Sequence, residues 1–374
     1  MTCPGCGGGP CRLALERPAP GLTSMATLLP VPTRVFACDA CGLLHSPALP
    51  DTSDYYANTY DTTSGAGDDL MGVDEAGRPI YRLQRQAEVI AARVAGVARG
   101  RLLDFGCGHG AFMRAFAAAR PGWRVEGAEV SDRYAAPDVT VGALPAGPFD
   151  LITALYVFEH LEQPAEVATQ LARRLAPGGR LLLTVPNPVA NPVDLLAVDH
   201  RSHFTPSSLE RVLTRSGLQM DTCDDDTLPA TWLAHATATA TPHATPSLRD
   251  DRDAARRLPA YWTDVDRTLE AFLTSTPDAP GSLAIYGAGV WGLCLRTHPA
   301  FRAETLACFI DRNPRKQGTS LHGAPVVGPE SIPASVNAVL IGVRPESVPA
   351  VESLPALAPY RRFTLPPWRT PCEA

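Results

Sequence analysis

The chain has 374 residues, which is too long for one ordinary domain and predicts two or three. Hydrophobic residues make up 45% of it, which is enough to form real cores. Charged residues make up 19% and the formal net charge is -6, which disfavours a nucleic-acid binder, because such a protein normally presents a basic face. We see no basic and apolar leader and no apolar run long enough to span a membrane, so we expect a cytoplasmic protein with no membrane partner.

Two Cys-x-x-Cys pairs open the chain, Cys3 with Cys6 and Cys38 with Cys41. In a reducing cytosol such pairs indicate metal rather than disulfides, and together they supply the four thiolates of a zinc ribbon. Four protein ligands leave no open position, so the predicted Zn2+ is structural and stabilises a segment too small to bury its own core. The alternative is two unmetallated cysteine pairs in a loop; Cys11 is expected to be a simple thiol.

Residues 50–77 are polar and rich in tyrosine, and they show no periodicity. We expect a loop with one short helix, of the kind that often forms a lid or a binding loop. In residues 78–100 the apolar side chains fall on one stripe, which predicts a helix of about five to six turns packed before the first core strand.

The stretch LLDFGCGHGAF, at 102–112, organises the chain. A buried strand ends at Asp104, and Gly106, Gly108 and Gly110 follow before a helix. Glycines let the backbone turn sharply and approach a ligand closely, and the helix that follows offers free N–H groups to polar ligand atoms. The next strand ends in Glu129, whose carboxylate can accept both hydroxyls of a ribose.

This order of residues resembles the fingerprint of class I S-adenosylmethionine (SAM) methyltransferases. A generic Gly-rich turn of another nucleotide-binding fold is the alternative. The third strand lacks the acid that often meets adenine in this class, so Leu144 and its backbone are expected in that role. The cofactor-binding residues that we expect are Asp104, Gly106, Cys107, Gly108, Gly110, Glu129, Leu144 and Leu155.

From residue 101 to about residue 241 strand and helix patterns alternate, which predicts a doubly wound α/β sheet with ligands at the carboxyl ends of its strands. The predicted strands are near 101–105, 124–129, 138–141, 149–155, 179–185, 219–224 and 231–240. The predicted helices are 110–119, 164–176 and 206–216, with a Pro-Gly-Gly turn between the second helix and the strand after it.

Residues 243–280 read as a linker and a bridging helix, and a second strand–turn–helix follows with Gly287, Gly289 and Gly292. The next strand ends at Asp311, and a further strand is predicted at 337–343. This pattern indicates a smaller Rossmann-like domain. From spacing alone the glycines and the acid are close to a dinucleotide site.

Three features together resemble one family. A four-cysteine ribbon ending CDACGLLHSP precedes the SAM core, DHRSHFTPSSL follows its fifth strand, and a Rossmann-like module carries YGAGVWG and DRNPRKQG. The order is similar to that of the three-domain, zinc-containing SAM-dependent C-methyltransferases that act on nucleotide-linked keto-deoxysugars in antibiotic sugar pathways. The resemblance covers nearly the whole chain and implies a ribbon and lid segment at 1–64, a methyltransferase core at 65–242, and a linker helix with a Rossmann-like domain at 243–374.

That resemblance implies C-methylation through an enolate. A base removes the proton next to a ketone, and the enolate carbon attacks the sulfonium methyl. The family's base is the histidine of a Tyr-x-Glu-His motif, which corresponds to His200 here, with Asp199 in place of the glutamate that orients it. The sequence departs from the motif at Ala197, where the family has tyrosine. His203 lies where similar sequences often carry an aromatic residue.

Three more side chains are candidates for catalysis or substrate contact. His160 follows the fourth strand at the catalytic end of the sheet, where the family places a polar residue; a capping or packing histidine is the alternative. Tyr56 and Tyr60 match family tyrosines before the core, and one of them is expected to hydrogen-bond the enolate oxygen, unless they are ordinary loop tyrosines. For His200 the alternative is a loop histidine near the cleft.

Other functions stay open. An N- or O-methyltransferase, or another displacement enzyme, on a non-sugar metabolite is the second candidate, and a regulatory protein that binds SAM is the third. The C-terminal glycine loop frames the substrate or is structural, binds a nucleotide diphosphate, or binds NAD. We expect a small-molecule partner and a monomer.

Overall fold

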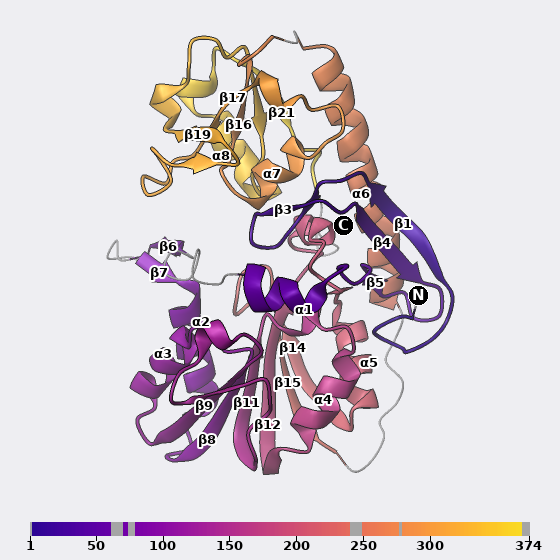
Figure 1. The fold of residues 1–374 in the computed structure, drawn as a ribbon, viewed down its shortest axis with the longest axis vertical. Helices are drawn as coiled ribbons and strands as arrows, with labels where there is room; N and C mark the ends of the chain where they lie inside the picture. Colours follow the sequence, from indigo (N-terminus) through magenta and orange to yellow (C-terminus); the bar gives the residue numbers. More distant parts are fainter. Residues whose placement is uncertain (1, 61–69, 74–78, 240–248, 277–278, 369–374) are drawn as a thin grey trace. The chain divides into compact units, whose positions relative to one another are not determined.

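The computed structural model describes residues 2–60, 70–73, 79–239, 249–276 and 279–368 (Figure 1). It divides the chain into two compact units, each of which draws on several segments. Unit 1 comprises residues 1–12, 37–190 and 199–254, and unit 2 comprises residues 13–36, 191–198 and 255–374. The three-domain boundaries expected from the sequence form a different division and stay a prediction.

The first strands are β1 (Cys11–Arg17), β2 (Gly21–Leu22), β3 (Leu28–Leu29), β4 (Thr33–Cys38), β5 (Leu44–His45), β6 (Leu70–Val73) and β7 (Pro79–Tyr81). The following ones are β8 (Gly100–Phe105), β9 (Trp123–Glu129), β10 (Val139–Val141), β11 (Phe149–Leu155), β12 (Leu175–Pro186), β13 (Ser202–His203), β14 (Leu218–Asp224) and β15 (Thr231–Ala238). The last are β16 (Leu283–Tyr286), β17 (Leu306–Ile310), β18 (Ser320–Leu321), β19 (Ala324–Val327), β20 (Ala338–Ile341) and β21 (Arg361–Thr364).

The α-helices are α1 (Thr52–Asp54), α2 (Arg82–Arg93), α3 (Ala111–Ala119), α4 (Pro164–Ala172), α5 (Pro206–Arg215), α6 (Arg249–Thr274), α7 (Val290–Arg296) and α8 (Val348–Glu352). Two short helical segments matter for the site, the π-helix η1 (Tyr55–Thr59) and the 3-10 helix η3 (Phe158–His160). Among the described residues no helix is both long and apolar enough to cross a bilayer.

Unit 1 is built on a seven-stranded sheet in the order β10-β9-β8-β11-β12-β15-β14. The strands from β10 to β12 are parallel, and β15 is antiparallel to both β12 and β14. The strand order reverses at β8, which has β9 on one side and β11 on the other. This arrangement confirms the predicted class I methyltransferase core, and a ligand is expected at the carboxyl ends of β8 and its neighbours.

Helices cover both faces of this sheet (Figure 1). Leu102 and Leu151 are fully buried in one hydrophobic cluster with residues of α2 and α3. Leu103 and Ile152, the next residue on each strand, are fully buried in another cluster with residues of α4 and α5. Successive strand side chains point to opposite faces, so a strand buried on both sides reads as the continuous apolar run seen in the sequence.

Two element boundaries differ from prediction. Helix α2 has 12 residues, because Pro79–Tyr81 forms strand β7 against β6 and the helix ends at Arg93, three residues before Gly96. Helix α4 ends at Ala172, and β12 begins at Leu175, so the Pro-Gly-Gly segment belongs to the strand. Proline and glycine mark an interruption in the sequence but do not show which element absorbs it.

The tyrosine-rich stretch is helical at its start, as α1 and η1, which agrees with the expected short helix. The remainder of the stretch lies largely outside the described residues, at 61–69 and 74–78. In the same unit β5 pairs with β13 in antiparallel register, with His45 opposite Ser202 and Leu44 opposite His203.

Unit 2 holds a six-stranded sheet in the order β18-β19-β17-β16-β20-β21. Strands β19, β17, β16, β20 and β21 are parallel, which confirms a smaller Rossmann-like fold. The predicted strands before Gly287, before Asp311 and at 337–343 are β16, β17 and β20. The predicted bridging helix lies within α6, whereas residues 240–248 of the expected linker lie outside the described part of the chain.

Candidate functional site

The glycine loop after β8 is held in a tight turn. Gly106, Gly108 and Gly110 have φ angles of 74°, 50° and 71°, in the left-handed region that favours glycine. A Cβ at Gly106 would lie 2.5 Å from Val157 Cγ2, so the loop leaves no room there for a side chain. The Gly106 N–H donates to Ala128 O at 2.8 Å, which folds the loop over β9.

Glu129, at the end of β9, connects the loop to the neighbouring strand. Its Oε2 accepts from the Gly108 N–H at 2.8 Å, and its Oε1 accepts from the Val130 N–H at 2.7 Å. Oε1 also accepts from the Ser131 N–H at 3.4 Å, whereas Oε2 keeps a second lone pair with which Glu129 can still accept a hydroxyl group. Cys107 is buried between these residues, and a Cβ at Gly127 would lie 2.6 Å from its Sγ.

Asp104 is the penultimate residue of β8 and is 3% exposed. Thr153 Oγ1 donates a hydrogen bond to its Oδ1 at 2.8 Å. Burial raises the pKa of Asp104 to about 7, and the charge of Glu129 adds to the rise, although the Thr153 hydrogen bond opposes it. Near neutral pH a cation bound at the loop would therefore favour the ionised form of this carboxyl group.

Gln86 on α2 is a separate indication of a ligand. Its amide is fully buried, and neither its Nε2 nor its Oε1 has a hydrogen-bond partner within the described residues. One turn earlier the Arg82 guanidinium lies 5.1 Å from the ring centroid of Tyr156, the residue after β11. This face of α2 therefore lies beside the carboxyl end of the sheet. An amide both donates and accepts, which suits the zwitterionic amino-acid end of SAM.

The two remaining predicted cofactor residues are both partly buried. Leu144 is partly buried against the cluster of α4 and α5, and Leu155 is partly buried against the cluster of α2 and α3. A turned glycine loop, two acids and an unpartnered amide fit SAM, and they would hold its ribose and its amino-acid end. Which atoms each residue contacts stays a prediction.

A second group of side chains gathers at the same end of the sheet. The Tyr56 hydroxyl donates to Asp199 O at 3.0 Å and lies 2.9 Å from His160 Nδ1, which is itself 3.0 Å from Asp199 O. Burial, followed by the charge of Asp199, raises the pKa of Tyr56, so its phenol stays protonated. The structure thus joins two of the predicted residues, Tyr56 and His160.

The rings around His160 form a compact cluster. Its ring centroid lies 4.8 Å from that of His200 and 5.5 Å from that of Tyr60. A carboxylate oxygen of Glu159 and one nitrogen of each histidine, His160 and His200, lie within 4.8 Å of one another. The sequence reasoning missed Glu159, although it precedes His160 in the stretch already singled out.

Asp199 and His203 contact residues that the sequence analysis did not assign. Asp199 is 1% exposed, and its Oδ2 accepts from the Tyr55 hydroxyl at 3.4 Å. His203 is buried on β13, with its Nε2 3.2 Å from Ser46 Oγ and its ring 6.4 Å from that of His200. Tyr55 belongs to the tyrosine-rich stretch, whereas nothing in the sequence pointed to Ser46.

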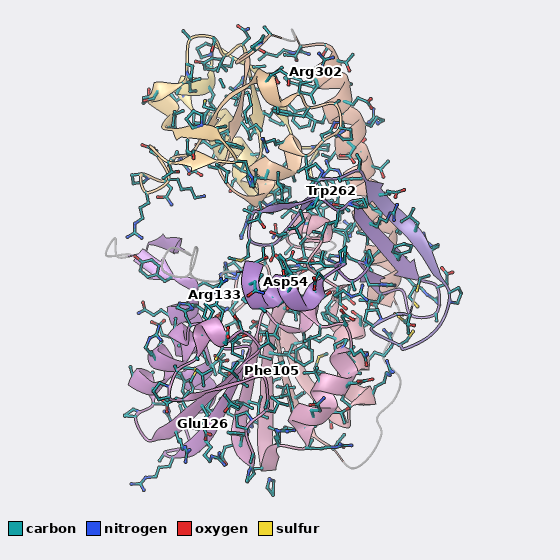
Figure 2. The ribbon with its side chains drawn as sticks, in the orientation of Figure 1. Asp54, Phe105, Glu126, Arg133, Trp262 and Arg302 are labelled. Atoms are coloured by element: carbon teal, nitrogen blue, oxygen red, sulfur yellow. The ribbon has the colours of Figure 1, made fainter. Side chains whose placement is uncertain are left out.

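The segment with the tyrosines is hydrogen-bonded to residues that follow β9, the strand that ends in Glu129. Ser131 Oγ donates to Ala57 O at 2.9 Å, and Arg133 Nη2 donates to Asn58 O at 2.5 Å. Both donors follow Glu129 closely in the chain, and Figure 2 labels Arg133 and, on α1, Asp54. The histidine–tyrosine cluster and the glycine loop therefore belong to one region of unit 1.

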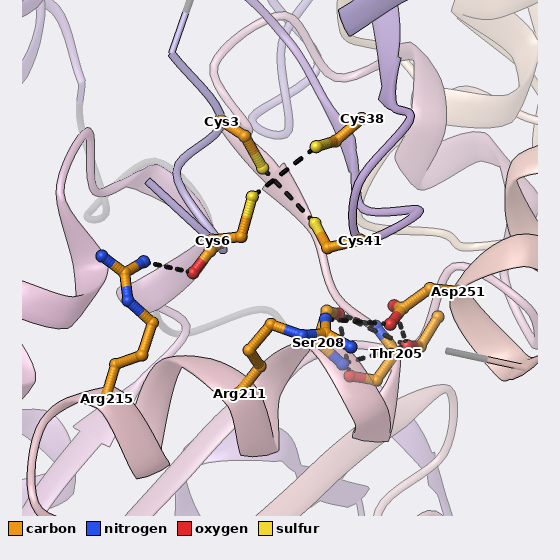
Figure 3. Close-up of polar contacts among 10 residues, drawn as sticks. Cys3, Cys6, Cys38, Cys41, Thr205, Ser208, Arg211, Arg215 and Asp251 are labelled. Atoms are coloured by element: carbon orange, nitrogen blue, oxygen red, sulfur yellow. Dashed lines mark hydrogen bonds and ion pairs between the residues drawn. The ribbon is translucent and has the colours of Figure 1, made fainter. Parts of the chain in front are cut away.

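The four predicted zinc ligands converge (Figure 3). The Sγ–Sγ distance is 3.6 Å for Cys3 and Cys41 and 3.7 Å for Cys6 and Cys38, and all four sulfurs lie within 4.8 Å of one another. A zinc tetrahedron with Zn–S bonds of about 2.3 Å has S–S edges of about 3.8 Å. Burial raises the pKa of Cys6, and the nearby Cys41 and Cys38 add to the rise. The donor set and its geometry fit Zn2+.

The cysteine cluster is braced by α5 and in turn supports the histidine segment. Arg215 Nη1 donates to Gly5 O at 2.6 Å (Figure 3). From Cys41 the chain runs directly into β5, and the Ser46 N–H that follows donates to Arg201 O at 3.2 Å. A zinc ion at the cluster would therefore fix the strand that backs the residues after His200.

The glycine loop of unit 2 is shaped by its own backbone. A Cβ at Gly287 would lie 2.2 Å from Gly342 O, and one at Gly292 would lie 1.9 Å from Gly287 O. Asp311 Oδ2 accepts from the Ala288 N–H at 3.1 Å and lies 3.3 Å from Lys316 Nζ. Packing accounts for these two glycines, and a ligand of this loop stays a prediction.

Comparison with known proteins adds a family match. Residues 80–222 match the family model described as a methyltransferase domain. The chain is similar to the ubiquinone biosynthesis O-methyltransferase of Aromatoleum aromaticum, with 30% identity over 113 residues, 25% of this chain and 47% of that protein. It is also similar to the enzyme of the same name from Xanthomonas axonopodis pv. citri, with 23% identity over 216 residues, 48% of this chain and 87% of that protein.

The chain spans less than half the length of the first curated relatives that it matches, with 47% and 41% covered. Among solved structures it is similar to the CcbJ methyltransferase from Streptomyces caelestis, with 15% identity, 51% of this chain and 100% of that chain covered, and a TM-score of 0.38. Residues 80–222 of this chain form a SAM-dependent methyltransferase domain.

Proposed function

We propose that the chain is a SAM-dependent methyltransferase that transfers a methyl group to carbon on a nucleotide-linked keto-deoxysugar. The observation that carries this proposal is the cluster of Tyr56, His160 and His200 at the end of the sheet that bears the glycine loop. The four-cysteine site is proposed to hold structural zinc, with no part in the transfer itself.

The cluster provides the two groups that a carbon acid needs. His200 takes the proton from the carbon next to the ketone, and the nearby Glu159 carboxylate favours the imidazolium that results. The electron pair moves to the carbonyl oxygen, where the protonated phenol of Tyr56 can donate a hydrogen bond to the enolate in exchange for its bond to Asp199 O. SAM supplies a methyl group that already carries its leaving group. The enolate carbon bonds to that methyl carbon as the carbon–sulfur bond breaks, which leaves S-adenosylhomocysteine.

A second candidate is O-methylation of a non-sugar metabolite. The curated relatives are named O-methyltransferases, and Ala197 stands where the resembled sugar enzymes carry tyrosine. A hydroxyl acceptor needs a base but no donor to an enolate oxygen, so the paired histidine and protonated tyrosine favour carbon.

Solvent exchange tests the carbon-acid step apart from methyl transfer. The full chain is incubated in D2O with S-adenosylhomocysteine and a keto-deoxysugar nucleotide, and NMR follows the proton next to the ketone. We expect exchange with the wild-type chain and little with His200→Ala. Methyl transfer to a hydroxyl of any acceptor without such exchange would favour the second candidate.

A further inference from the structure

Three arginine side chains are buried among the residues that the structure describes: Arg17, Arg201 and Arg211, with 4%, 9% and 7% exposed. Two of them have a carboxylate partner. Arg17 lies 2.9 Å from Asp266 Oδ1, and Arg211 lies 3.2 Å from Asp251 Oδ2. Arg201 forms no ion pair with any described residue, and its Nε and Nη1 have no hydrogen-bond partner there.

The groups near Arg201 supply little negative charge. Burial lowers the pKa of Arg201, and Glu162, then Tyr56 and Cys3, oppose that shift; Glu162 is exposed and forms no ion pair with Arg201. Tyr56 stays protonated because its pKa is raised. His45 is neutral near pH 7, since burial and then the charge of Arg201 lower its pKa to about 4. A guanidinium buried without an ion-pair partner is costly unless an anion joins it.

Its position connects Arg201 with the chemistry of the site. It follows His200 directly, its carbonyl oxygen accepts from the Ser46 N–H at 3.2 Å, and Tyr56, which contacts His160, is among the groups that act on its charge. A buried cation without a partner, next to the proposed base, is a site for a negative group of the ligand.

We propose that Arg201 binds an oxyanion of the methyl acceptor, a phosphate or a carboxylate. This inference rests on the proposed function and narrows its substrate class to acidic acceptors. The planar guanidinium can donate two parallel N–H bonds to either oxyanion, and an anion in this place neutralises the buried charge. Acceptors without an acidic group are then bound more weakly by this chain.

A competing explanation is charge compensation of the zinc–thiolate cluster, which would carry two negative charges. The two explanations predict different losses when the guanidinium is removed. If Arg201 binds the acceptor, acceptor binding is lost; if it compensates the cluster, zinc is lost.

The test is calorimetric titration of the full, zinc-loaded chain with S-adenosylhomocysteine present. The probes are thymidine 5′-diphosphate, thymidine and benzoate, so that phosphate and carboxylate are distinguished. We expect the wild-type chain to bind at least one of the two anionic probes, and Arg201→Gln to weaken that binding roughly tenfold to a hundredfold. Arg201→Lys keeps the positive charge but loses the planar guanidinium, so its affinity for the anionic probe should lie between those of the wild type and Arg201→Gln. If Arg201→Gln does not fold, Arg201→Lys takes its place in the comparison with the wild type.

Arg180→Gln, which removes an exposed arginine of β12, is the matched control and should bind as the wild type does. Affinity for S-adenosylhomocysteine and one zinc per chain should be unchanged in all variants. Unchanged anion binding by Arg201→Gln, binding of neither anion by the wild type, or zinc loss with anion binding intact overturns the proposal. Absence of methyl transfer with Arg201-dependent anion binding intact would instead count against the proposed function.

Discussion

At the scale of single residues, the proposed chemistry rests on a histidine pair and a phenol brought together from distant parts of the chain. The Tyr56 hydroxyl contacts His160 and the backbone of Asp199, and His160 packs against His200. His203, in the same sequence motif, contacts Ser46 Oγ, and one of its ring nitrogens lies within 4.8 Å of a ring nitrogen of His200. Of the two histidines in the motif, His200 is the one that packs against His160.

The first prediction concerns His200 and uses His203 as its control. His200→Ala should lower kcat by roughly two to four orders of magnitude, because a positioned base contributes that much to proton removal. His203→Ala should change kcat far less, since its imidazole contacts Ser46. Steady-state rates of both variants decide the matter, and a near-normal rate for His200→Ala would exclude it as the base.

A second prediction concerns Gln86. Gln86→Leu removes a buried amide that has no partner in the described structure, so the free chain should melt at an equal or higher temperature. SAM should bind about tenfold more weakly, because its amino-acid end loses a partner. Calorimetry and thermal melting measure both effects, with the exposed Gln84→Leu as control. Unchanged SAM affinity would place Gln86 outside the cofactor site.

Asp104 gives a prediction about pH. Its folded-state pKa is raised to about 7, so the folded chain binds this proton more tightly than the unfolded chain does. Its contribution to stability is present below about pH 4 and is lost as the pH rises toward 7. Melting temperatures of the SAM-free chain should fall less over this range in Asp104→Asn than in the wild type or in the exposed control Asp138→Asn. Parallel curves for all three chains would contradict the raised pKa.

At the scale of elements, the cysteine cluster supports the strand pair behind the histidine segment. The chain passes from Cys41 into β5, β5 pairs with β13, and Arg215 of α5 holds the first cysteine turn through Gly5. The zinc ion is therefore expected to affect both stability and catalysis, although it takes no part in methyl transfer.

The corresponding prediction compares two cysteines. Cys38→Ser removes a zinc ligand, so the chain should lose its metal and melt about 10 °C lower or more. Turnover should fall with it, because β5 is no longer anchored. Cys11 lies 3.3 Å from His45 Nε2 and is not one of the four convergent sulfurs, so Cys11→Ser should keep one zinc per chain. Metal analysis settles the point, and full zinc in Cys38→Ser would refute the tetrathiolate site.

The sequence predicted the elements better than the contacts between them. Strands β8 and β11 are buried on both faces and read as apolar runs, and the turn after β8 is marked by glycines. Helix α2 was predicted too long, because the apolar stripe continues into β7 and past Val94. Local periodicity cannot show where strand pairing replaces a helix.

From the sequence, a residue of the candidate site could be predicted only where its side-chain chemistry or its motif pointed to a function. Histidines and tyrosines draw attention by their chemistry, whereas the Tyr56–His160 contact depends on how the tyrosine-rich segment packs against the residues after β11. Only their burial and the presence or absence of hydrogen-bond partners made three further residues candidates: Glu159, Ser46 and Arg201. Such information is tertiary, and spacing in the sequence does not contain it.

At the scale of the whole molecule, each of the two units has a glycine loop after a strand of its parallel sheet, but the two loops differ. In unit 1 the loop turns through three left-handed glycines beside two acids and an unpartnered amide. In unit 2 neighbouring backbone atoms occupy the space that a Cβ at Gly287 or Gly292 would need. We therefore assign the cofactor to unit 1 and expect one SAM per chain.

The most direct test follows a labelled methyl group. The full chain is incubated with SAM carrying a 13C-methyl group and a keto-deoxysugar nucleotide, and the product is examined by NMR. The proposed function predicts a 13C-methyl group bonded to the carbon next to the ketone, with S-adenosylhomocysteine released in equal amount. A label on oxygen or nitrogen, or no transfer to any sugar nucleotide, would contradict it.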